Sequence, residues 1–244
     1  MSIPWIVAGA ASGLIAGPWI RSVVFRRSVE YGDPLRYSWS ACSSEVLPER
    51  GSWRVPLSSL GRCRSCGARI GPYPVTAELA GGLALAIVVG RSATGWEAAA
   101  LAWLCLVGVA LACIDLAVRR LPETLNVVAF VGTMALFLVA ALAGHDLWRA
   151  GRAAAAATVL AGGYLLIALI RPGGLGFGDA ELAGSVGAAL GWFGWITLVE
   201  GTFLAFVFCA AYIGILRVAH GSQTARKVPF SPFMLLGALA AIAI

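Results

Sequence analysis

The sequence predicts an all-α fold, a polytopic transmembrane helical bundle of about eight spans. Of its 244 residues, 59% are hydrophobic and only 12% are charged, a balance that water-soluble domains of this size do not have. Apolar runs close to the roughly 20 residues needed to cross a bilayer recur along nearly the whole chain. The chain is therefore expected to be an integral, multi-pass membrane protein.

The apolar runs, taken in order, predict spans near residues 3–25, 73–90, 97–115, 124–143, 153–170, 179–193, 195–216 and 229–244. The first follows no basic segment, so we expect a retained anchor rather than a signal peptide. The sixth is short and runs almost directly into the seventh through residues 191–194. It is therefore expected to be either a full span or a re-entrant piece.

Three segments follow from this pattern: a first transmembrane anchor (1–25), a loop with a partial cysteine knuckle (26–72), and the helical bundle (73–244). Alternating the spans places residues 21–72, 116–123, 171–178 and 217–228 on one side of the membrane. Those segments hold fifteen of the eighteen basic residues. By the positive-inside rule this side is cytoplasmic, which predicts a cytosolic loop, outward-facing termini and location in the cytoplasmic (inner) membrane.

The net charge of +6 is explained by the same topology. Arginines that flank the spans on one side favour anionic lipid headgroups. Membrane lipid is thus an expected partner, and no nucleic-acid partner is needed to account for the charge.

Two carboxylates stand out because a charge at membrane depth is costly and persists where it faces a bundle interior or water. Asp115 closes the third span, just before a cytoplasmic turn, and Asp179 opens the sixth span, just after one. Two aspartates from different helices thus arrive at the same depth on the same face. Such a pair can share a proton, one acting as base toward a water molecule and the other as acid toward a carbonyl oxygen.

The glycines before Asp179 suit a site for an extended substrate. Gly176 and Gly178 permit close approach of the backbone, and non-helical backbone at membrane depth is tolerated where it lines a cavity. Each aspartate also has a structural alternative: Asp179 could be a helix N-cap, and Asp115 could pair with Arg119 one turn later.

The cysteines of the long loop indicate a candidate metal site. Cys63 and Cys66 form a Cys-x-x-Cys pair, and Cys42 is the obvious third ligand. Three residues after Cys42 stands Glu45, so a second pair is missing. The alternative is a pair of reduced thiols in a turn.

The motifs together resemble the type IV prepilin peptidases, membrane aspartyl proteases with a Gly-x-Gly-Asp motif. Residues 176–179, GFGD, match that motif, and IDLAVRRLPETLN matches the stretch around the family's first aspartate. Three further segments follow the family's order: GPWIRSVVFR, GRCRSCGARIGPYPVTAE and VPFSPFMLLGA. The resemblance covers nearly the whole chain.

This resemblance implies Asp115 and Asp179 as the catalytic pair of a metal-independent peptide-bond hydrolase. It implies that the substrates are prepilin-like precursors of pilus or type II secretion systems, with a short basic leader that is cut just before an apolar helix. Glu78 is then a candidate for binding the leader's positive charge; its alternative is an interhelical hydrogen-bond partner. Gly176 and Gly178 would shape the backbone that faces the substrate.

The sequence departs from the family pattern in informative places. Arg21 stands where the signature usually has asparagine, Glu181 where the aspartate motif commonly has lysine, and Ser231 where the C-terminal motif has glycine. Because Glu181 is off the pattern, we expect it to matter far less than Asp179. Members with both cysteine pairs are thought to bind zinc and to methylate the new terminus with S-adenosylmethionine. The missing pair argues against the methylation and leaves a three-cysteine candidate for zinc.

Two other functions also use intramembrane carboxylates. A transporter would place them near the bilayer midplane within repeated halves, whereas here the pair lies at one edge and the halves show no inverted repeat. The other alternative is a non-catalytic membrane scaffold.

Overall fold

The computed structural model describes residues 3–30, 32–47, 57, 61–63, 65–170, 175–220 and 228–244. These residues form eight α-helices, and their only β pairings are two isolated bridges. The helices are α1 (Ile3–Arg27), α2 (Thr76–Arg91), α3 (Gly95–Val118), α4 (Glu123–Ala143), α5 (Leu147–Ile170), α6 (Phe177–Phe193), α7 (Trp195–His220) and α8 (Ser231–Ala243). The predicted all-helical bundle is confirmed, with one helix at each expected span.

Five helices, α1, α3, α4, α5 and α7, are long and apolar enough to cross a membrane by length and composition. The other three are shorter, with 16, 17 and 13 residues in α2, α6 and α8. At 1.5 Å per residue α6 measures about 26 Å, slightly less than a typical hydrocarbon core of about 30 Å. All residues of α6 from Leu182 to Trp192 are buried, so beyond its first turn it is an inner helix enclosed by its neighbours.

Small residues allow the helices of this bundle to approach closely, as is common in membrane proteins. A Cβ atom at Gly191 of α6 would collide with the Cβ of Ala156 on α5, and one at Gly13 of α1 would collide with the backbone of Gly81 on α2. The α1–α2 and α5–α6 pairs are consequently packed backbone to backbone.

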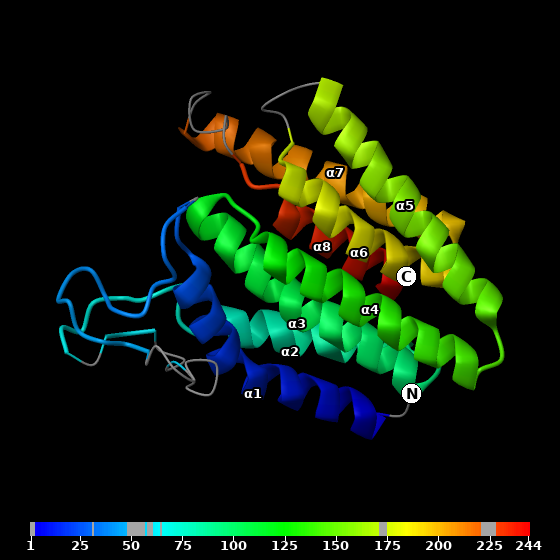
Figure 1. Cartoon of the computed structure of the whole chain (residues 1–244), viewed down its shortest axis with the longest axis horizontal. Helices are drawn as coiled ribbons and strands as arrows, with labels where there is room; N and C mark the ends of the chain where they lie inside the picture. The colour runs from blue at the N-terminus through cyan, green and yellow to red at the C-terminus, as the bar shows by residue number, and fades with distance from the viewer. Residues whose placement is uncertain are drawn as a thin grey trace.

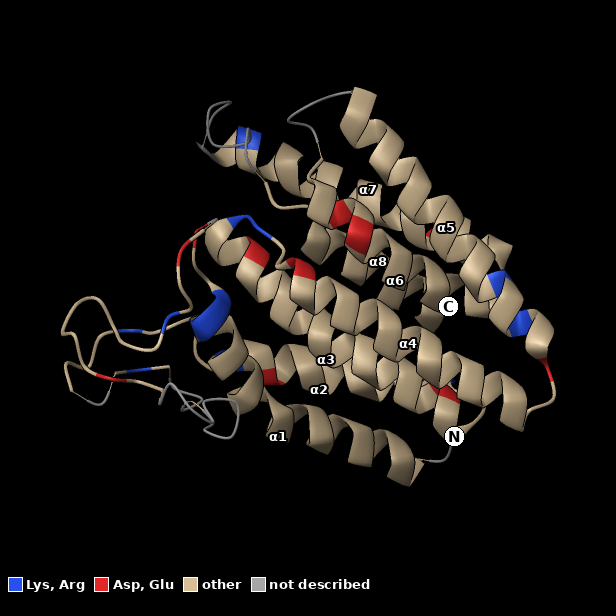
Figure 2. Ribbon diagram, viewed as in Figure 1, with Lys and Arg blue, Asp and Glu red and all other residues tan. Residues whose placement is uncertain are grey.

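The connections at the two ends of the bundle differ in length, and the short ones, between α2 and α3, α4 and α5, and α6 and α7, share one end. Figure 1 shows the loop between α1 and α2, the α3–α4 turn and the starts of α6 and α8 at the opposite end, with both termini at the end of the short connections. This is the arrangement that alternating spans predict. Figure 2 shows that acidic positions also gather at the end opposite the termini, where α3 ends and where α4 and α6 begin.

The loop after α1 contains two tight turns of similar build. The Ser38–Glu45 bridge closes the first and the Arg62–Arg69 bridge closes the second. A small apolar cluster supports both turns; its buried members are Phe25, Leu47, Cys63 and Ile70. The turns therefore rest on the end of α1, at the same end of the molecule as the two candidate aspartates.

Candidate active site

Asp115 lies in the last turn of α3 and is 6% exposed. The hydroxyl of Ser231 donates to its Oδ2 at 2.6 Å, and the backbone N–H of Ser231 donates to the same oxygen at 3.3 Å. Ser231 is the first residue of α8, so the positive end of that helix dipole also points at the carboxylate. Asp115 is thereby held by α8, while its Oδ1 accepts no hydrogen bond from the described residues.

The alternative role for Asp115, an ion pair with Arg119, is not present in the structure. Among the described residues Arg119 makes no ion pair with Asp115. The Arg119 backbone N–H instead donates to the Asp115 backbone carbonyl at 2.8 Å, and Arg119 ends α3 in the left-handed conformation.

Asp179 is the third residue of α6, and its Oδ2 accepts the backbone N–H of Gly176 at 3.0 Å. Gly176 is the N-cap, so the capping alternative is correct in part: Asp179 caps the helix from inside its first turn rather than from the N-cap position. Capping occupies one carboxylate oxygen and leaves Oδ1 available for other chemistry.

The two aspartates lie close enough for the charge of Asp115 to act on Asp179. Tyr164 of α5 also lies within electrostatic range of Asp179, and its hydroxyl has no hydrogen-bond partner among the described residues. The Tyr164 ring packs against Phe230, the residue before Ser231, with the ring centroids 5.8 Å apart. Four helices, α3, α5, α6 and α8, thus contribute to one site.

Gly178 determines how closely the start of α6 approaches the α3–α4 turn. A Cβ atom at position 178 would lie 2.8 Å from the Cβ of Leu121. Two carbon atoms that are not bonded to each other do not approach this closely. The side-chain amide of Asn126 on α4 donates to the Gly178 carbonyl at 3.2 Å. Since Leu121 lies in the turn after Asp115, this contact sets the position of Asp179 relative to Asp115.

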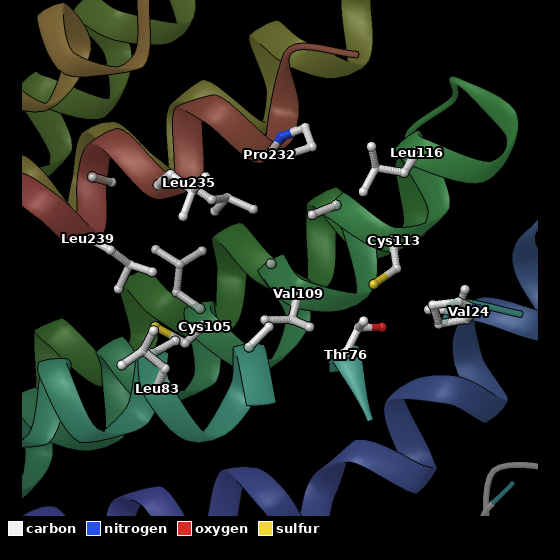
Figure 3. A pocket seen from close by; sticks show the side chains of 18 of the residues that line it. Val24, Thr76, Leu83, Cys105, Val109, Cys113, Leu116, Pro232, Leu235 and Leu239 are labelled. Atoms are coloured by element: carbon white, nitrogen blue, oxygen red, sulfur yellow. The ribbon is translucent and has the colours of Figure 1, made fainter. Parts of the chain in front are cut away.

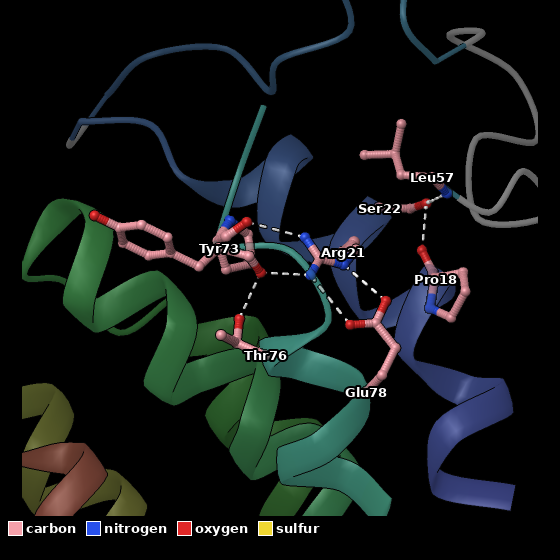
Figure 4. A network of polar contacts seen from close by, with 8 residues as sticks. Pro18, Arg21, Ser22, Leu57, Tyr73, Thr76 and Glu78 are labelled. Carbon is pink, nitrogen blue, oxygen red and sulfur yellow. Dashed lines mark hydrogen bonds and ion pairs between the residues drawn. The ribbon is translucent and has the colours of Figure 1, made fainter. Parts of the chain in front are cut away.

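Glu78 lies apart from this arrangement. Its carboxylate is 4% exposed, and both oxygens accept hydrogen bonds from Arg21 of α1, at 2.8 and 3.1 Å. Arg21 also donates to the carbonyls of Pro72 and Tyr73 (Figure 4). Glu78 therefore has the geometry of its alternative role, that of an interhelical hydrogen-bond partner. The same contacts explain how Arg21 is accommodated where the family signature usually has asparagine.

An apolar groove of about 1270 Å³ runs along α2, α3 and α8. Figure 3 shows side chains from the three helices converging on it, among them Leu83, Val109 and Leu235. Leu116 and Pro232 line the groove, and they are the chain neighbours of Asp115 and Ser231. An apolar segment in this groove would therefore lie alongside the end of α3 that carries Asp115.

The three predicted cysteine ligands come together in the loop. The sulfur atoms of Cys42, Cys63 and Cys66 all lie within 4.8 Å of one another, and the first two are 3.7 Å apart. The Ser44 hydroxyl lies 3.4 Å from the Cys63 sulfur. Together with the backbone N–H groups of Cys66 and Ser65, it lowers the pKa of the Cys63 thiol to about 6. Cys63 is thus prepared to act as a thiolate ligand near neutral pH.

Sequence reasoning identified the aspartates but not their supporting partners. Ser231 was noted only as a departure from the family pattern, and Asn126 and Tyr164 were not singled out at all. Asn126 did carry a signal, because it is a polar residue in an apolar span, and it is only 2% exposed in the structure.

The Ser231 hydroxyl is expected to contribute to turnover, because it fixes one oxygen of Asp115. A hydrogen bond to a charged group contributes about 1.5–3 kcal/mol, so Ser231→Ala should lower kcat for peptide-bond cleavage about tenfold or more. Ser231→Gly, which also lacks the hydroxyl, should lower it equally. The matched control is Ser185→Ala in α6, which removes a buried hydroxyl without a described partner. A smaller effect for Ser231→Ala than for this control would contradict the assignment.

Comparison with known proteins agrees with the site. Residues 99–215, which include both aspartates, match the type IV leader peptidase family. A prepilin leader peptidase/N-methyltransferase of Burkholderia pseudomallei (strain K96243) is 27% identical over 272 residues, covering 94% of this chain and 82% of the relative. The protein of that name from Aeromonas salmonicida (strain A449) is 31% identical over 212 residues, covering 81% of this chain and 68% of the relative.

A further relative with the same name, from Bacillus subtilis (strain 168), is 29% identical over 193 residues, covering 77% of this chain and 74% of the relative. No solved structure matches the chain. The matched region contains the Gly-x-Gly-Asp stretch and the end of α3, which the fold brings together. This chain therefore belongs to the type IV leader peptidase family.

Proposed function

We propose that the chain is a membrane-embedded aspartyl endopeptidase that removes the short basic leader from type IV prepilin-like precursors, for pilus or type II secretion assembly. The observation that carries this proposal is that the turn after Asp115 packs against Gly178, the residue before Asp179, so that both aspartates lie at one end of the bundle. The relatives named prepilin leader peptidase support the substrate class.

The chemistry needs one water molecule between the two carboxylates. One aspartate accepts a proton from the water as its oxygen attacks the scissile carbonyl carbon, and the other donates a proton to the carbonyl oxygen. Collapse of the tetrahedral intermediate breaks the C–N bond, and the leaving nitrogen takes a proton from the pair. The products are the leader with a new carboxylate and the mature chain with a new amino terminus. Ser231 and Gly176 each hold one carboxylate oxygen during these steps.

The substrate's orientation follows from the surroundings of the pair. We place the apolar segment of the precursor in the groove along α2, α3 and α8, and the leader beyond the aspartates at the loop end of the bundle. The excess of arginines in the loops favours a cytoplasmic location for that end. The reaction then occurs at the cytoplasmic face of the inner membrane, where the leader of an inserted precursor is located.

Zinc fits the loop cysteines. Three thiols whose sulfur atoms lie within 4.8 Å of one another match the preference of zinc for thiolate ligands. Cys42, Cys63 and Cys66 would hold the ion, which would tie the two turns of the loop together. The cysteines are separate from the carboxylate pair assigned to the hydrolysis, so the proposed role of zinc is structural.

Zinc content provides a direct test of the three cysteines. The purified wild-type protein is expected to hold about one zinc per chain, and Cys63→Ser to lose most of it, because three ligands cannot spare one. Cys209→Ser, in α7, is the control and should keep the wild-type content. Retention should decrease as the pH is lowered, because protons compete with the metal for the thiolate ligands. Equal zinc in Cys63→Ser and wild type would reject the site.

The relatives' names also include an N-methyltransferase activity. Members of the family with both cysteine pairs are the ones associated with methylation, and here Glu45 stands where the second pair would be completed. We restrict the proposal to the peptidase activity.

The direct test of the proposed function uses the purified protein in lipid vesicles with a prepilin-like precursor. Mass spectrometry of the product should show one cut immediately before the apolar segment. A precursor that remains intact in the presence of folded protein would contradict the proposal. Substrate movement without a cut would favour a transporter, and stable binding without a cut would favour a scaffold.

A further inference from the structure

Glu181 differs from the family pattern in the sign of its charge, because the family commonly has lysine at this position. It lies on α6, two residues after Asp179, and its side chain is exposed. The Asn126 amide donates to its Oε2 at 2.9 Å, while its Oε1 has no hydrogen bond from the described residues. A carboxylate is therefore fixed beside the catalytic pair at a position where the family commonly has lysine.

Asn126 provides a second, independent observation. Its amide nitrogen faces two acceptors, the Gly178 carbonyl and Glu181, and this fixes the orientation of the amide. The amide oxygen, Oδ1, is left buried and has no hydrogen-bond partner among the described residues, although the side chain is only 2% exposed. Native proteins usually satisfy such an atom, and only a group with a hydrogen-bond donor can do so.

The unused groups are all acceptors. Glu181 Oε1 and Asn126 Oδ1 can accept hydrogen bonds, and the carboxylate adds a negative charge. An ammonium or guanidinium group supplies donors only, together with the opposite charge. The exposed Glu181 carboxylate, with its Oε1 unused, therefore favours a lysine or arginine side chain over an anion or an apolar group.

The position of Glu181 indicates where that side chain comes from. The groove runs beside the end of α3 that carries Asp115, where Leu116 lines it, whereas Glu181 belongs to the helix that carries Asp179. In the proposed reaction the scissile bond lies between the two aspartates. With the apolar segment on the Asp115 side of that bond, the leader continues toward α6 and Glu181.

We propose that Glu181, held by Asn126, binds a basic side chain of the leader and so contributes to substrate specificity. This inference rests on the proposed peptidase function. It revises the expectation that Glu181 matters little, because that expectation treated a departure from the motif as a lost function rather than as a changed one.

The test compares two precursors, one with a basic leader and one in which the leader's Lys and Arg are replaced by Gln. Wild type is expected to cleave the basic precursor with a lower KM. Glu181→Gln keeps the shape and the Asn126 bond but removes the charge, and it should reduce the kcat/KM preference for the basic leader about tenfold, mainly through KM. Added salt should reduce the wild-type preference and have less effect on the variant.

Glu123→Gln is the matched control. Glu123 is an exposed carboxylate at the start of α4, one turn from Asn126, and its substitution changes the net charge by the same amount. The control should leave the preference at the wild-type value. An equal loss in both variants would show a general field effect and overturn the proposal.

A charge exchange completes the test. Glu181→Lys should cleave a precursor with Glu in place of the leader's Lys and Arg better than it cleaves the basic precursor. If Glu181→Gln lowers kcat equally for basic and neutral leaders, Glu181 serves only to hold Asn126 and the proposal fails. Failure of the proposed function is distinguishable, because wild type would then cleave neither precursor.

Discussion

Leader cleavage is expected to decrease by about 10³-fold or more in Asp115→Asn and, independently, in Asp179→Asn, because in the proposed mechanism each aspartate performs one half of the proton transfer. An amide keeps the size of the side chain but cannot exchange a proton at neutral pH. The measurement is the rate at which a prepilin-like precursor loses its leader in vesicles that contain each purified variant.

Both asparagine variants should fold, because the contacts that hold the aspartates are ones an amide oxygen can keep. The Ser231 hydroxyl can donate to an amide oxygen at position 115, and the Gly176 N–H to one at position 179. A melting temperature within a few degrees of wild type would establish this. Asp146→Asn, at the α4–α5 turn, is the control for a lost charge, since within the described part of the chain its carboxylate accepts a hydrogen bond only from the local backbone N–H of Arg149.

The double variant distinguishes a pair from two separate groups. Residues that act as a unit are not additive, so Asp115→Asn/Asp179→Asn should be no slower than the slower single variant within error. Near-wild-type cleavage by either single variant would refute the dyad.

The positions of the helices could be predicted from the sequence because apolar runs and their breaks report directly on membrane crossing. The meeting of Asp115 and Asp179 at one end of the bundle also followed from counting spans. The contacts at the aspartates did not follow, since Ser231 lies 116 positions from Asp115 and only the packing of α8 against α3 brings them together.

The charged positions show the same limit. Glu78 was a candidate for binding the leader, but the close approach of α1 and α2 gives its carboxylate to Arg21. Glu181 was set aside, but α4 supplies Asn126 to hold it. In both cases a residue on a neighbouring helix decides the role, and a single sequence does not reveal which residues will face each other.

Gly178 connects the motif to the geometry of the pair, and Gly178→Ala is expected to lower kcat about 100-fold. The added methyl group would lie 2.8 Å from the Cβ of Leu121, so either the start of α6 or the α3–α4 turn must move by several tenths of an ångström or more. A misplacement of about 1 Å near a reacting centre can cost that much rate. The measurement is leader cleavage under saturating precursor, which separates positioning from binding.

Leu121→Gly provides the decisive control, because it removes the atom that the new methyl group meets. If the collision is the cause, Gly178→Ala/Leu121→Gly should cleave faster than Gly178→Ala alone, even though Leu121→Gly by itself loosens the turn. Gly163→Ala in α5, where a Cβ meets nothing within 4 Å, should cleave at the wild-type rate. If the double variant is as slow as Gly178→Ala, the cost comes from the backbone of the motif itself, and the distance between α6 and the turn does not set the spacing of the aspartates.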